Sequence, residues 1–69
     1  MRRYIGEMNG EKFLGNKSKR ELHDLDNEKP QCYIDEIIQC SNEIPFNFVF
    51  EAKHSGFDNC AYCIGKSAK

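Results

Sequence analysis

Four cysteines in a chain of 69 residues constrain the fold of this protein more than any other feature of its sequence. A domain this short buries only about 60% of the surface that its unfolded chain exposes, so hydrophobic burial alone leaves it marginally stable. Four cysteines can add stability either as two disulfides or as ligands of one metal ion. The start of the chain has no apolar stretch that could serve as a signal peptide, and no run of residues is long and apolar enough to cross a membrane. We therefore expect a cytoplasmic protein, in which thiols stay reduced and zinc is favoured over disulfides.

Two of the cysteines, Cys60 and Cys63, form a C-x-x-C pair within the sequence GFDNCAYCIG. Cysteines at this spacing can bind one zinc ion from a single tight turn whose backbone amides hydrogen-bond the sulfurs. Redox proteins use the same spacing, but a thioredoxin-like pair lies at the start of a helix after the first strand of a βαβ unit. This pair lies six residues from the end of the sequence, which favours a zinc half-site.

The remaining ligands must come from the other histidines and cysteines. Cys32 and Cys40 are eight residues apart on a predicted helix, about 12 Å along its axis, which is too far for one ion if the helix is continuous. His23 and Cys32 flank a polar loop that can fold back and bring them together. Cys40 in place of His23 is the alternative, and His54 is expected to be solvated. The predicted zinc ligands are His23, Cys32, Cys60 and Cys63.

Residues 11–25 predict a β-hairpin. Gly15-Asn16 supplies the positive φ that a tight turn requires, and apolar residues flank it on both sides. A loop over residues 26–31 follows, because Pro30 keeps the residue before it out of the helical region. Residues 1–10 are predicted to form a flexible arm anchored only by Tyr4 and Ile5, residues 65–69 a flexible tail, and residues 11–64 the zinc-binding domain.

The rest of the chain predicts two short helices separated by a strand. Isoleucines at helical spacing mark the first helix, in CYIDEIIQC: Ile34, Ile37 and Ile38. Alternation in IPFNFVF predicts a strand with three core phenylalanines on one face: Phe46, Phe48 and Phe50. The second helix is expected over Glu51 to Ser55, ending at Gly56. The fold class is therefore α+β: a small zinc-stapled domain made of a β-hairpin and a strand with two short helices.

The alternating acids of DLDNE, at positions 24, 26 and 28, imitate the start of an EF-hand calcium loop. That loop needs glycine at its sixth position and glutamate at its twelfth, where this chain has Lys29 and Asp35. The segment is therefore interpreted as a solvated loop over the zinc site.

Charge is distributed unevenly along the chain. Residues 1–20 carry six basic side chains against two acids, a net +4, whereas residues 21–51 carry eight acids and one lysine, a net −7. The pI of about 6.1 is not that of a dedicated nucleic-acid-binding domain. The sequence also contains no phosphate-binding glycine loop and no nucleophile with a nearby base, so no enzymatic activity is expected.

The segment FEAKHSGFDNCAYC, Phe50 to Cys63, resembles the metal-binding domain of the bacterial Ada DNA-repair protein, whose pattern is E-A-x-x-x-G-[FY]-x-x-C-x-x-C. Upstream, that family has a C-x-x-x-C element that completes a zinc site of four thiolates. In this chain His23 and Cys32 stand at those two places, with a longer loop between them. The first cysteine of that element accepts a methyl group from a DNA phosphotriester, which an imidazole cannot do. The resemblance thus implies the Ada-like fold and the metal, without the repair chemistry.

These observations predict a monomeric zinc-binding module with a structural metal site that interacts with an unknown partner, either protein or nucleic acid. Two alternatives remain open. The first is a thiol-based methyl acceptor or DNA-repair-related domain, and the second is a redox or metal-handling protein that uses Cys60 and Cys63.

Overall fold

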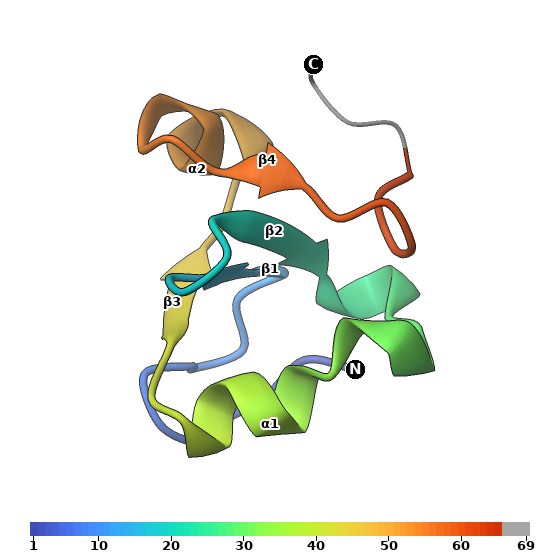
Figure 1. Cartoon of the computed structure of the whole chain (residues 1–69). Coiled ribbons are helices and arrows are strands. Elements are labelled where there is room, and N and C mark those ends of the chain that lie inside the picture. Colours follow the sequence, from blue (N-terminus) through green and yellow to red (C-terminus); the bar gives the residue numbers. More distant parts are fainter. Residues whose placement is uncertain (66–69) are drawn as a thin grey trace.

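The computed structural model describes residues 1–65 and shows a four-stranded sheet with one helix on each face (Figure 1). The strands lie in the order β3-β1-β2-β4; β1 pairs antiparallel with β2 and β3, and β2 pairs parallel with β4. The strands are β1 (Phe13–Asn16), β2 (Glu21–Asp24), β3 (Glu43–Phe46) and β4 (Asp58–Asn59). The helices are the 3-10 helices η1 (Leu25–Asn27) and η2 (Pro30–Cys32) and the α-helices α1 (Ile34–Gln39) and α2 (Val49–His54). The predicted α+β class is confirmed.

The predicted β-hairpin is present as β1 and β2, but its turn lies further along the chain than expected. Gly15 and Asn16 are both inside β1, and residues 17–20 make the turn. A Cβ atom on Gly15 would lie 2.8 Å from the Phe46 ring and 2.9 Å from the Phe57 ring. The glycine is therefore required by the close approach of two aromatic rings to the strand, and not by the turn.

Alternation along the hairpin strands divides the core into two parts, one on each face of the sheet. Leu14 packs with α1 and the buried cysteines on one face, and its neighbour Phe13 packs toward α2 on the other. The cluster on the α1 side comprises Met8, Leu14, Leu25, Cys32, Ile34, Ile37, Cys60 and Cys63. The cluster on the α2 side comprises Phe13, Leu22, Ala52 and Phe57.

The isoleucine stripe predicted for α1 is confirmed, since Ile34 and Ile37 are buried and Ile38 is half-buried. The helix begins later than expected, however. Tyr33 adopts the left-handed conformation, with φ 53° and ψ 47°, and separates α1 from η2. Cys32 therefore ends a 3-10 turn that begins in the predicted polar loop, and it does not form the first turn of α1.

The prediction of a strand with three core phenylalanines was wrong. β3 ends at Phe46, because the Glu51 carboxylate accepts the backbone N–H of Phe48 at 3.4 Å and caps a helix that starts at Val49. The change from strand to helix leaves Phe48 56% and Phe50 69% exposed. Only Phe46 of the three packs against the α2-side cluster.

The second predicted helix is confirmed as α2, two residues longer at its start than expected. Its end also follows the prediction: Ser55 is the C-terminal cap, and Gly56 adopts φ +92°. His54 is exposed, as expected.

The N-terminal arm contacts the domain through residues other than the predicted ones. Tyr4 and Ile5, the expected anchors, are 75% and 63% exposed. The buried residue is instead Met8, and the backbone N–H of Glu7 donates to Oε2 of the buried Glu43 at 2.8 Å. Residues 66–69, most of the predicted tail, lie outside the described residues. Within residues 1–65, no helix is long and apolar enough to span a bilayer.

Candidate metal centre

The structure brings all four predicted ligands together. The ligand atoms of His23, Cys32, Cys60 and Cys63 lie within 4.8 Å of one another, and each of the four residues is buried. Cys40, the alternative ligand, is exposed and lies outside this cluster, as does His54. The arrangement therefore separates the predicted ligands from the other histidine and cysteine of the chain.

Strand β2 organises the site. His23 lies opposite Leu14 across the hairpin, so both side chains occupy the sheet face covered by α1. The parallel pairing of β2 with β4 continues one residue beyond β4, where the Cys60 N–H donates to the Leu22 carbonyl at 2.8 Å. Cys32 is the last residue of η2 and is buried.

The interatomic distances match a tetrahedral metal site. The Sγ atoms of Cys32 and Cys60 are 3.8 Å apart, and Sγ of Cys63 lies 3.7 Å from Nδ1 of His23. Zinc bonds of about 2.3 Å to sulfur and about 2.0–2.1 Å to nitrogen give tetrahedral edges of about 3.8 Å between sulfurs and about 3.6 Å between sulfur and nitrogen. These two distances thus agree with those between ligands of one zinc ion, and all four ligand atoms lie within 4.8 Å of one another.

Backbone amides donate to two of the sulfurs, one from the C-x-x-C turn as predicted and one from β2. The Tyr62 N–H donates to Cys60 Sγ at 3.4 Å, within the C-x-x-C turn itself. The Asp24 N–H donates to Cys63 Sγ at 3.2 Å, from the residue that follows His23. Hydrogen bonds of this kind favour the thiolate form and fix the orientation of metal ligands.

Burial sets the protonation states of the cluster. Burial lowers the pKa of His23, against the opposing effect of Glu21 and Glu28, so the imidazole is neutral near pH 7 and can offer a lone pair. Burial also raises the pKa of Cys32 and Cys63, and neighbouring cysteines add to the increase at Cys63. Three thiolates in one buried cluster would repel one another, so their ionised form requires a cation between them.

The His23 ring provides a further indication that the residues fit a metal. One ring nitrogen, Nδ1, faces the sulfur of Cys63, and the buried Nε2 has no hydrogen-bond partner within residues 1–65. A buried imidazole in ordinary packing normally has its nitrogens satisfied by protein or water. A buried ring with one nitrogen beside a cysteine sulfur and the other unpartnered is consistent with a metal ligand.

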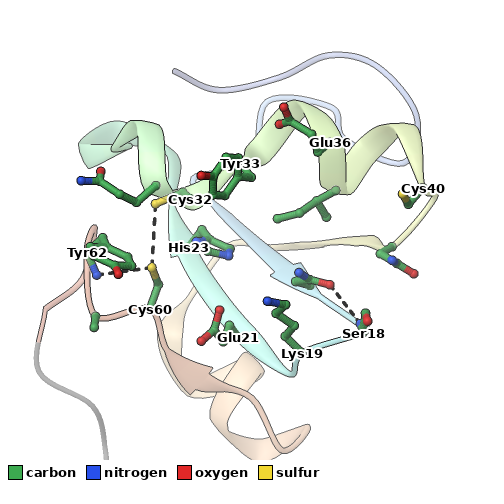
Figure 2. A pocket seen from close by; sticks show the side chains of 15 residues that line it. Ser18, Lys19, Glu21, His23, Cys32, Tyr33, Glu36, Cys40, Cys60 and Tyr62 are labelled. Carbon is green, nitrogen blue, oxygen red and sulfur yellow. Dashed lines mark hydrogen bonds between the residues drawn. The ribbon is translucent and has the colours of Figure 1, made fainter.

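A groove of about 530 Å³ lies beside the cluster, and His23, Cys32 and Cys60 all contribute to its lining (Figure 2). Sequence reasoning missed its other contributors, including the exposed Tyr33 and Tyr62. A signal for both was present, because each tyrosine is adjacent in sequence to a predicted metal ligand.

The fold and the cluster together define a small α+β domain whose three clustered cysteines and one histidine could hold a metal ion. No family model, curated protein or solved structure matches this chain. The resemblance to the Ada metal-binding domain therefore rests on the sequence pattern alone.

Proposed function

We propose that this chain is a small zinc-stapled interaction module in which His23, Cys32, Cys60 and Cys63 hold one structural zinc ion. The observation that carries the proposal is the burial of four ligand atoms within 4.8 Å of one another, two of whose separations match tetrahedral edges. Three sulfurs and one imidazole nitrogen are the donor set that zinc prefers over hard cations such as calcium or magnesium. Reduced thiols are needed for this site, so a cytoplasmic location fits the proposal.

The role assigned to the metal is structural. Four protein ligands complete a tetrahedral shell and leave no coordination position for a water molecule or substrate. The ligands come from β2, from η2 and from the turn after β4, so one ion would connect segments 28 and 40 residues apart in sequence. In so short a chain, metal binding and folding are expected to be coupled.

Each residue of the Ada-like pattern has a structural role in this chain, which supports an Ada-like fold. Glu51 caps α2 and Ala52 is fully buried beneath that helix. Gly56 ends the helix with φ +92°, and Phe57 packs in the α2-side cluster. The pattern thus describes a helix and turn that deliver the C-x-x-C pair to β2. We propose a shared architecture on this basis and no methyl transfer, because His23 stands where the family has its reactive cysteine.

The test is native mass spectrometry of protein purified without added metal, beside cysteine variants. We expect one zinc ion per chain in the natural protein and in the control Cys40→Ser. Cys60→Ser and Cys63→Ser should lose the metal and the dispersed amide NMR spectrum, since a structural zinc site provides about 10–16 kcal/mol of apparent binding free energy to folding.

Three results would contradict the proposal. A dispersed spectrum in metal-free Cys60→Ser or Cys63→Ser would show that folding does not depend on the site. Loss of zinc from Cys40→Ser would transfer the fourth ligand from His23 to Cys40. A metal-free mass lowered by two or four hydrogens would indicate disulfides instead of zinc.

A further inference from the structure

The groove beside the metal centre runs between α1 and the sheet. Figure 2 shows Tyr33, Glu36 and Cys40 on its helical side and Ser18, Lys19 and Glu21 on the side of the hairpin, with His23 between them. Its volume of about 530 Å³ falls within the range of about 300–1,000 Å³ that is usual for binding pockets. A groove with α1 on one side, the hairpin on the other and the buried His23 between them has a shape that suits an extended peptide.

Two exposed aromatic rings contribute to this groove. Tyr33 is 63% exposed and Tyr62 is 59% exposed. Tyr33 directly follows Cys32 and is held in the left-handed conformation, and Tyr62 lies inside the C-x-x-C turn. Because both rings are attached to metal-ligating segments, the metal would fix their positions. Exposed tyrosines on rigid turns provide large contact areas at low entropic cost, and their faces attract cations.

The charge of the groove is predominantly negative. Within residues 1–65, the carboxylates of Glu21 and Glu36 make no ion pair, and the one lysine that lines the groove is Lys19. A zinc ion with three thiolates and a neutral imidazole adds a further formal negative charge.

Two acidic residues between His23 and Cys32, Asp26 and Glu28, are paired with arginines of the N-terminal arm, unlike the acids of the groove. Arg2 pairs with Asp26 at 2.9 Å, and Arg3 pairs with Glu28 at 2.7 Å. Among these four acidic side chains, all within residues 1–65, those without an ion pair are therefore Glu21 and Glu36, which line the groove.

We propose that this groove binds a basic, extended segment of a partner protein. Lysine or arginine side chains of the segment would lie against the faces of Tyr33 and Tyr62 and pair with the carboxylates of Glu21 and Glu36. The same carboxylates and thiolates repel phosphates, so the groove disfavours nucleic acid. This inference rests on the proposed function, because the metal holds both tyrosine-bearing turns in place.

The test is a titration of the zinc-loaded, ¹⁵N-labelled protein, followed by amide NMR. We expect a short alternating lysine–glycine peptide to give saturable shifts around Tyr33, Glu36 and Tyr62, weakened by added salt. A glutamate–glycine peptide of equal length and a short oligothymidylate should give none. Glu36→Gln should weaken binding about two- to fivefold, the effect of losing one exposed charge pair. Glu7→Gln, an exposed acid outside the groove, is the matched control and should bind like the natural protein.

The zinc content of each sample, measured by native mass spectrometry, separates the two proposals. Zinc-loaded protein that gives no shifts, shifts elsewhere, or binding unchanged by Glu36→Gln would overturn the groove proposal and leave the zinc module intact. Binding of oligothymidylate or of the acidic peptide would also overturn it. A folded protein that contains no zinc would overturn both.

Discussion

At the scale of single residues, His23 distinguishes this site from one built of four thiolates. It is the one ligand that is neutral when bound, and burial already lowers its pKa, so no proton needs to leave it near pH 7. It also extends directly from β2, the strand that anchors the C-x-x-C turn through Leu22. His23 therefore connects the metal to the centre of the sheet.

Removing the His23 imidazole should lower zinc affinity far more than removing the imidazole of His54. We expect His23→Ala to lower zinc affinity by more than about 100-fold, beyond the usual effect of changing a residue that only supports a ligand. A competition titration with a chromophoric zinc chelator measures the change. His54→Ala, which alters an exposed residue outside the cluster, should keep the natural affinity. Equal affinities for the two variants would remove His23 from the ligand set.

Ligand chemistry could be predicted at this scale because it depends on residue type. Thiols and imidazoles are few in the chain. The helix expected to hold Cys32 and Cys40 apart is not continuous, because Tyr33 interrupts it, but Cys40 still lies outside the cluster. The groove could not be predicted in the same way. Tyr33 and Glu36 line the same groove as Lys19 and Glu21 only because α1 lies over the sheet, and no local sequence pattern records that arrangement.

At the scale of secondary-structure elements, the errors of sequence reasoning have two causes: a tertiary contact overrode local preference at Gly15, and a local helix cap overrode the hydrophobic alternation at Phe48. Gly15-Asn16 has the preference of a hairpin turn, yet two rings pack onto Gly15 and keep it within β1. Phe46, Phe48 and Phe50 alternate as in a strand, yet the cap provided by Glu51 starts a helix between them. The spacing of hydrophobic residues along the sequence reveals neither the aromatic rings beside Gly15 nor the helix cap formed by Glu51.

The role of Gly15 can be tested directly. Gly15→Ala should lower the free energy of unfolding by about 1–3 kcal/mol, because the added methyl group overlaps the rings of Phe46 and Phe57. Urea denaturation at a fixed zinc concentration measures the loss. If crowding is the cause, Phe46→Leu in the same chain should restore part of the stability, so the two substitutions should couple. Additive effects would instead show that the Phe46 ring does not crowd the added methyl group.

At the scale of the whole molecule, the basic N-terminal segment forms ion pairs with the acidic middle of the same chain. The basic arm lies against the acidic segment that connects His23 to Cys32. The two terminal guanidinium nitrogens of Arg3 donate to Glu28, at 2.7 and 2.9 Å, and its Nε donates to Asp35 at 3.0 Å. The arm thus neutralises the loop over the metal site, and its Arg3 side chain is engaged with carboxylates and not free to contact phosphate.

This interaction predicts a specific pH dependence. The Arg3 guanidinium lowers the pKa of Glu28 to about 2, from an unperturbed value of about 4.5. A carboxylate whose pKa is lower in the folded state contributes stability above its unfolded pKa, and that contribution is lost as the pH falls toward the folded pKa. We expect Glu28→Gln to reduce the free energy of unfolding by about 1 kcal/mol at pH 7, as for a well-formed ion pair at the surface.

The stability difference between the natural protein and Glu28→Gln should stay constant from pH 8 to about pH 5 and shrink as the pH falls below about 4.5. Urea denaturation across this range measures it, and zinc release in acid cancels to first order because both proteins carry the same ligands. Glu36→Gln is the control, because Glu36 makes no ion pair within residues 1–65. It should change stability by less than about 0.5 kcal/mol at every pH. Equal behaviour of the two variants would mean that Arg3 does not hold the arm against the loop, and that the charge asymmetry of the sequence is not compensated within the fold.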